Sequence, residues 1–207
     1  MPLALAGINS EVTKELNLKF PASLYLVLVR IGGRQMAFLR QKEILSQIAN
    51  NYQYSHTEFF EEDSSDVLWE KLRDFRGYNI NTTILGRVFS TPTRLRGLLA
   101  HISEYLQKIE LKVALSVQPG FGTMEFYFDG VSNSAKVDVE VIMSEIHRIV
   151  LENNSHLNYE QLPSELKYGF NMWGPINRGS LDLMKSLRRT YDPTRKLNRG
   201  RYITDSE

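Results

Sequence analysis

The chain has 207 residues, and its 25 Lys and Arg nearly balance its 24 Asp and Glu, for a formal net charge of +1. This balance gives no electrostatic reason to expect nucleic acid or an anionic membrane as a partner. The absence of cysteine excludes disulfides, thiolate metal sites and cysteine nucleophiles, and fits a cytoplasmic protein. Hydrophobic residues at 42% and charged residues at 24% are typical of a globular protein with a substantial core.

The first half of the chain predicts two strands and two helices. Residues 23–31 are almost continuously apolar and end at Gly32-Gly33, which indicates a buried strand. Residues 34–49 carry apolar side chains at helical spacing. Residues 52–60 alternate weakly and predict a second strand, and Ser64 or Ser65 begins a short helix.

The second half predicts a regular order of elements. Thr91-Pro92 is a cap followed by proline in the first helical turn, which marks the start of a long helix. The predicted order is strand 81–89, this helix, strands 110–117 and 123–128 around the hairpin loop 118–122, helix 137–151 and strand 157–162. Strand, helix, strand, strand, helix, strand is the order of a ferredoxin-like unit.

We therefore predict an α+β fold. It is an antiparallel sheet with helices packed on one face, built on a ferredoxin-like βαββαβ unit and extended by an N-terminal β-α-β segment. Because no Pro/Gly/Ser-rich or highly charged linker interrupts the chain, residues 1–207 are expected to form a single domain. No apolar run approaches the roughly 20 residues of a membrane-spanning helix.

Residues 179–207 predict a helix with a defined stop and a basic tail. Ser180 is placed to cap the helix, and Lys185, Arg188 and Arg189 complement the negative end of its dipole. Pro193 cannot continue the helix, so the chain must leave it at Asp192. One stripe of the helix is apolar: Leu183, Met184, Leu187 and Tyr191.

This ending resembles the chain end of FAD-linked oxidases of the vanillyl-alcohol-oxidase type. There a helix is followed by Lys/Arg-x-x-Phe/Tyr-Asp-Pro-x-x-x-Leu-Asn-Pro-Gly-Arg/Lys. The matching residues here are Arg189, Tyr191, Asp192, Pro193, Leu197, Asn198, Gly200 and Arg201. Arg189 lies one place nearer the tyrosine than the pattern asks, and Arg188 fits that spacing better. Arg199 departs from the pattern, because it stands where the family has proline.

The resemblance extends upstream to the C-terminal, substrate-side domain of the FAD-binding E-type subunit of glycolate oxidase. It rests on the order of short matches, which together cover nearly the whole chain: Pro2-Leu3-Ala4-Leu5, Ile8-Asn9, residues 28–33, residues 68–74 and Trp173-Gly174-Pro175. The resemblance implies a cap domain over a flavin. No glycine-rich phosphate cradle follows a strand and begins a helix, so we expect FAD to be held mainly by a domain absent from this chain.

The resemblance also implies the chemistry and the partners. FAD would oxidise a small 2-hydroxy acid in a complex with a paralogous flavoprotein subunit and an iron–sulfur subunit, in the cytoplasm or at the inner face of the membrane through those subunits. Asn198, Gly200 and Arg201 are the candidate flavin contacts. Arg73, Arg87 and Trp173 are the candidate substrate contacts, because an arginine fork can hold a carboxylate bidentately. No catalytic residue is assigned, and the chain alone is expected to be inactive.

Metal and hydrolase chemistry have little support in the sequence. The four histidines lie in different segments without a second histidine at ligand spacing: His56, His101, His147 and His156. No serine lies on a Gly-x-Ser-x-Gly turn. We therefore predict no metal site.

Two alternatives from other classes remain. One is a cofactor-free ferredoxin-like module that binds a partner protein. The other, RNA binding, is suggested by residues 120–126, which partly match the RNP1 pattern on the third strand of the unit. However, Pro119 replaces the basic residue and Thr123 replaces a stacking aromatic residue, so we interpret the aromatic side chains as core and expect no nucleic acid.

Overall fold

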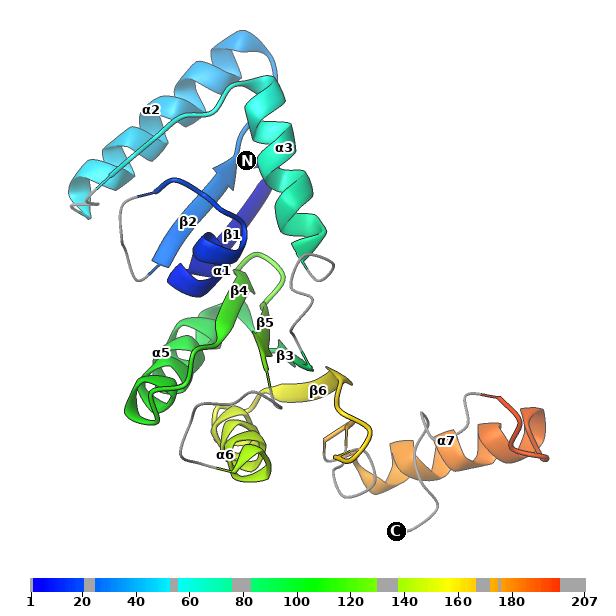
Figure 1. Ribbon diagram of the computed structural model, residues 1–207. Helices are drawn as coiled ribbons and strands as arrows, with labels where there is room; N and C mark the ends of the chain where they lie inside the picture. Colours follow the sequence, from blue (N-terminus) through cyan, green and yellow to red (C-terminus); the bar gives the residue numbers. More distant parts are fainter. Residues whose placement is uncertain are drawn as a thin grey trace.

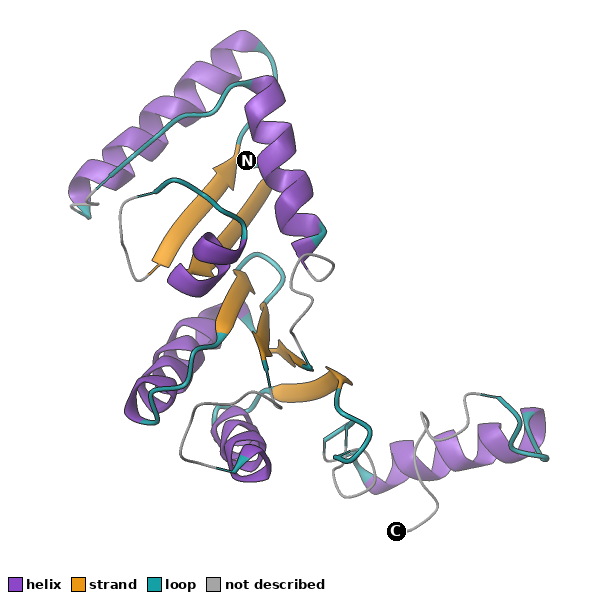
Figure 2. Cartoon of the chain, in the orientation of Figure 1, coloured by secondary structure: helices purple, strands orange, loops and turns teal. Residues whose placement is uncertain are grey.

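The computed structural model describes residues 2–20, 25–52, 56–75, 83–129, 138–166, 172–174 and 176–197. Its strands are β1 (Ala4–Asn9), β2 (Tyr25–Arg30), β3 (Ile84–Phe89), β4 (Ala114–Gln118), β5 (Thr123–Phe128) and β6 (His156–Gln161). Its helices are α1 (Ser10–Glu15), α2 (Gln35–Asn51), α3 (Glu62–Arg73), α5 (Pro92–Lys108), α6 (Val139–Glu152) and α7 (Arg178–Tyr191). Figure 1 and Figure 2 show their arrangement.

The predicted α+β class and the antiparallel sheet are confirmed. Six strands within the described residues form one sheet in the order β2-β1-β4-β5-β3-β6, and neighbouring strands in it are antiparallel. The last four strands have the ferredoxin-like order, with β3 between β5 and β6. The strands β1 and β2 extend this sheet beyond β4. No helix in the described part of the chain is long and apolar enough to cross a membrane.

The main core lies between the ferredoxin-like sheet and the helices α5 and α6. Pro92 lies in the first turn of α5, and the Asp138 side chain accepts a hydrogen bond from the Glu140 N–H at the start of α6. Each helix then turns one apolar stripe toward the sheet. The fully buried side chains of this core include Leu98, Ile102, Ile142, Ile146, Met124, Phe126 and Leu157.

A glycine in β3 makes room for a fully buried aromatic ring of this core. Gly86 pairs with Phe126 across β3 and β5, and the Phe126 ring lies over the Gly86 backbone. A Cβ at Gly86 would lie 2.0 Å from the Phe126 Cζ. Since Phe126 is 1% exposed, the ring has no solvent-filled space into which to move.

The N-terminal extension differs in part from the prediction. The strand predicted over 52–60 is wrong for residues 56–60, which form no strand, and residues 53–55 lie outside the described part. The β-α-β segment is instead β1-α1-β2, and Asn9 joins it to the sheet: its Oδ1 accepts from the N–H groups of Val12 and Leu115 at 3.2 and 3.0 Å. The helices α1 and α3 pack residues such as Val12 and Leu68 against the side of the sheet opposite α5 and α6. Helices therefore lie on both faces, and the prediction that they pack on one face is wrong for this extension.

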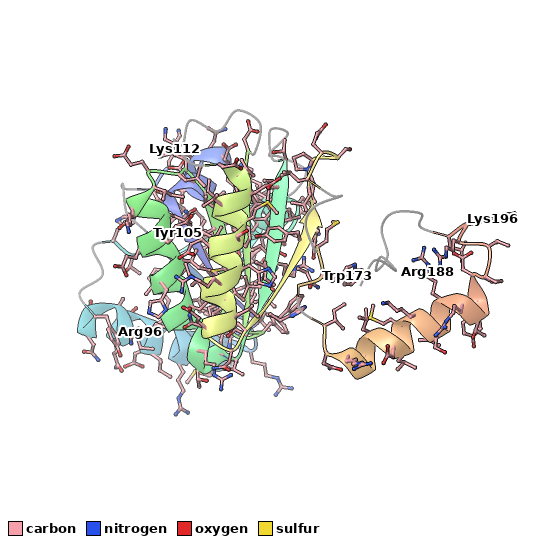
Figure 3. All side chains as sticks on the ribbon, turned by 90° about the horizontal axis from the view of Figure 1, so that it is seen from below. Arg96, Tyr105, Lys112, Trp173, Arg188 and Lys196 are labelled. Atoms are coloured by element: carbon pink, nitrogen blue, oxygen red, sulfur yellow. The ribbon has the colours of Figure 1, made fainter. Side chains whose placement is uncertain are left out.

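The helix α7 stands away from the sheet (Figure 3). It begins earlier than predicted, because the Asn177 Oδ1, and not the Ser180 hydroxyl, caps it by accepting from the Ser180 N–H at 2.8 Å. It ends at the predicted stop. Asp192 is 9% exposed, and its carboxylate accepts from the N–H groups of Lys196 and Leu197 at 2.8 and 3.0 Å.

We expect Gly86→Ala to lower the free energy of unfolding by about 1–3 kcal/mol, because the added methyl group overlaps the buried Phe126 ring. Gly97→Ala, on the exposed side of α5 where a Cβ meets nothing within 4 Å, is the matched control. It should raise stability by up to about 1 kcal/mol. Urea denaturation of both variants measures the difference, and equal effects would contradict the packing.

Candidate site on the open sheet face

The side of the ferredoxin-like sheet opposite α5 and α6 carries mainly polar side chains. We call it the open sheet face and define it by Arg87 and Phe89 of β3, Ser116 and Gln118 of β4, Thr123 and Glu125 of β5, and His156, Asn158 and Glu160 of β6. These positions alternate along the strands with the buried core residues, as the period of two requires. Among the described residues, α1 and α3 cover only the part of this side near β1, Leu85 and Tyr127.

Arg87 lies at the centre of this face and pairs with two carboxylates. Its Nε donates to the Glu125 Oε1 at 2.8 Å, and its Nη1 lies 2.8 Å from the Glu160 Oε1. The Tyr127 hydroxyl also donates to Glu125. All three charged side chains are less than one-third exposed, so these pairs are stronger than ordinary surface pairs.

A hollow of about 340 Å³ adjoins Arg87. Its lining residues are Arg87, Phe89, Gln118, Phe121, Thr123 and Glu125. Gly122 fixes the loop that carries Phe121: it has φ +68°, and a Cβ there would lie 2.1 Å from the Ser90 carbonyl oxygen. Phe121 is 82% exposed and Phe89 is 40% exposed, so the hollow offers two aromatic side chains to a ligand.

The outer edge of β6 holds the segment that contains Trp173. The Tyr159 N–H donates to the Met172 carbonyl at 2.9 Å. With its amide oriented to satisfy its neighbours, Asn158 donates to the His156 Nε2 at 2.7 Å and to the Trp173 carbonyl at 3.2 Å. Figure 3 shows Trp173 between this edge of the sheet and α7.

The structure brings two of the three predicted substrate residues to neighbouring positions. Arg87 lies directly across from Asn158 in the β3–β6 register, and Asn158 in turn contacts the Trp173 backbone. Arg73 is not part of this group: it lies at the end of α3, where its exposed guanidinium pairs with Asp74 at 2.8 Å. The predicted flavin contacts Asn198, Gly200 and Arg201 lie outside the described residues, as does Pro175.

Sequence reasoning missed Glu125 and Glu160, the two partners of Arg87. Glu125 lies between the apolar Met124 and Phe126, and Glu160 follows the buried Tyr159, so the alternation of each strand places both glutamates on the face opposite the core. The two aromatic residues of the RNP1-like segment lie in different elements, since Phe126 is on β5 and Phe121 is in the turn before it. Phe126 is core, as predicted, but Phe121 is exposed, so the prediction that it is core is wrong.

No known protein family and no curated protein matches this chain. Among the described residues, no group of three or more His, Asp or Glu side chains is placed to hold a metal ion. On the open sheet face, Arg87 and its two carboxylates supply charge and hydrogen bonds, and the exposed aromatic side chains supply apolar contact area.

We expect the free energy of unfolding to fall as the pH decreases below about 6.5, the ordinary histidine pKa. Burial and the nearby His156 lower the pKa of His147 in the folded chain. The unfolded chain therefore binds a proton at His147 more readily than the folded chain does, so acid favours unfolding. Denaturation of the wild type and of His147→Gln from pH 7 to 5 measures this loss, which should be smaller in the variant. His101→Gln, exposed on α5, is the control, and an unchanged slope in His147→Gln would contradict the assignment.

Proposed function

We propose that this chain is the substrate-side cap domain of an FAD-dependent oxidoreductase that resembles the E-type subunit of glycolate oxidase. The observation that carries the proposal is the open sheet face. It combines a hollow, a charged centre at Arg87 and two exposed aromatic side chains on the side of the sheet that α5 and α6 leave free. The ordered sequence matches and the hydrogen-bonded stop at Asp192 support the same conclusion.

The flavin would be held mainly by another domain or subunit. Gly32-Gly33 lies between β2 and the long helix α2, but it lacks the further spaced glycines of a dinucleotide-binding turn, and Gly120 and Gly122 lie in the turn between β4 and β5. Bound flavin would accept a hydride from a substrate carbon. This chain would cover the flavin site, exclude water from it and orient the substrate.

The residues then take the following roles. Arg87 and the segment of Trp173 border the substrate, and Asn198, Gly200 and Arg201 approach the flavin. Arg73 is less suited to a substrate role, because it lies at the end of α3 and does not line the hollow. The substrate is a small hydroxy compound, and 2-hydroxy acids are the class implied by the resemblance. The resemblance further suggests paralogous flavoprotein and iron–sulfur partners and a cytoplasmic or membrane-peripheral location.

The exposed apolar stripe of α7 favours a partner protein under either leading hypothesis. Leu183, Leu187 and Tyr191 are 62%, 46% and 77% exposed on one side of this helix. Such a stripe on a helix that stands away from the sheet is typical of a docking surface. A cofactor-free interaction module would also use it, so the flavin dependence of the complex separates the two functions.

Mixing the chain with its cognate FAD-binding domain tests the proposal. We expect flavin affinity and turnover to rise on mixing. Leu187→Ala should weaken association by about tenfold, since a buried leucine side chain contributes about 1.5–3 kcal/mol. The same change should leave the thermal unfolding of the isolated chain nearly unchanged, because Leu187 is half-exposed there.

The control is Leu151→Ala on α6, which has a similar exposure but lies outside the α7 stripe. It should not affect association. Binding of the two proteins without any gain in flavin affinity or turnover would favour the interaction module. Absence of any complex would contradict both functions.

A further inference from the structure

We propose that a pocket beside α3 binds a small carboxylic acid with an aromatic body, for which phenylacetate is the test compound. The pocket has a volume of about 220 Å³. Its lining comes from the loop after α1, the segment before α3, and α3 itself. The pocket shares no residue with the open sheet face, so the proposal does not rest on the proposed function.

The loop after α1, residues 17–20, lines one part of the pocket and is fixed by hydrogen bonds. The N–H groups of Asn17 and Leu18 donate to the carbonyls of Lys14 and Thr13, each at 3.0 Å. Asn17 has φ +51°, a left-handed conformation that asparagine adopts more readily than most residues. The loop therefore needs no ligand to set its course, which limits the entropy that binding costs.

Aromatic and aliphatic side chains from all three segments give the pocket an apolar surface. The rings of Phe20 and Phe60 are in edge-to-face contact, with centroids 5.9 Å apart. Leu18, Val67 and Leu68 are the other apolar lining residues. Leu68 is buried in the core of the N-terminal extension, whereas Phe60 and Val67 are 40% and 52% exposed. Apolar surface is therefore left for a ligand ring to cover.

Two lysines add positive charge to this apolar surface. Lys19 comes from the loop and Lys71 from α3, where it is half-buried. Neither side chain has an ion-pair or hydrogen-bond partner in the part of the chain that the structure describes. An ammonium group only donates hydrogen bonds and a carboxylate only accepts them, so these two groups suit a ligand carboxylate.

One carboxylate also lines the pocket, but it does not cancel the charge of the lysines. Glu58 contributes −1, so the charged lining residues sum to +1, and its Oε2 lies 3.6 Å from the His56 Nε2. The acidic residues in the first turn of α3, Glu62 and Asp63, are exposed and do not line the pocket, so solvent screens their charge. The lining therefore favours a monoanion over a cation.

The size of the pocket limits the ligand to about one ring. Its volume lies below the range that is usual for drug-sized ligands, about 300–1,000 Å³. An inorganic anion would leave the apolar surface uncovered, and an uncharged aromatic compound would leave both lysines without a partner. An aromatic ring that carries one carboxylate satisfies both parts of the lining.

Amide NMR of the ¹⁵N-labelled full-length chain tests this proposal, with separate titrations of phenylacetate, phenylacetamide, 2-phenylethylamine and acetate. We expect phenylacetate to shift the amides of Lys19, Val67 and Lys71 in a saturable manner. Phenylacetamide keeps the ring but lacks the charge, so it should bind at least about tenfold more weakly. The amine and acetate should cause no saturable shifts at concentrations of phenylacetate that saturate the pocket.

Variants separate the two parts of the lining. Lys19→Gln and Lys71→Gln should each reduce the preference for phenylacetate over phenylacetamide by about threefold. Lys112→Gln, an exposed lysine outside the pocket, is the control and should leave that preference unchanged. Phe60→Ala should weaken both ligands alike, whereas Phe59→Ala, at a half-exposed aromatic residue outside the pocket, should weaken neither.

Three results would overturn the proposal. The first is the absence of saturable shifts with phenylacetate. The second is equal or tighter binding of phenylacetamide or 2-phenylethylamine by the wild type. The third is an unchanged preference for phenylacetate in both lysine variants. None of these results would affect the flavin complex, which the mixing experiment tests independently.

Discussion

The register between β3 and β5 is the constraint on which both the core and the candidate site depend. Gly86 pairs with Phe126, and the next residues along, Arg87 and Glu125, pair with each other on the opposite face. The Phe126 ring fits only because Gly86 has no side chain. A slip by one residue would place the ring on the open face and the ion pair in the core, so core packing determines the position of the charged site.

The charged site also stabilises this register from its own side. Arg87, on β3, forms ion pairs with a residue on each neighbouring strand: Glu125 on β5 and Glu160 on β6. Removal of Arg87 would take an ion-pair partner from two carboxylates that are less than one-third exposed, which is costlier than the loss of an exposed pair such as Arg148 with Glu145. The face is therefore fixed before a ligand or partner arrives, as preorganised binding requires.

Much of this fold could be predicted from local patterns. The element order from β3 to β6 follows from helical and alternating periodicity, and Pro92 and Pro193 mark one helix start and one helix end. The pairing of strands and side chains that lie far apart in the sequence could not be predicted from such local patterns. The sequence pattern identifies Arg87 as a charged strand residue, but only the sheet order shows that Glu125 and Glu160 flank it. Residues 56–60 continue a weakly alternating segment, yet none of the described strands pairs with them, so alternation alone misleads there.

The most direct test of the proposed function is to measure whether the FAD-binding domain covers the open sheet face in the complex. The chain has no native cysteine, so a single introduced thiol reports one position. Thr123→Cys lies on the open sheet face, and His101→Cys lies on the exposed side of α5. We expect the FAD-binding domain to slow maleimide labelling of the first variant at least tenfold and to leave the second unchanged. Equal labelling of both variants in the complex, or protection of the α5 position alone, would contradict the assignment of this face.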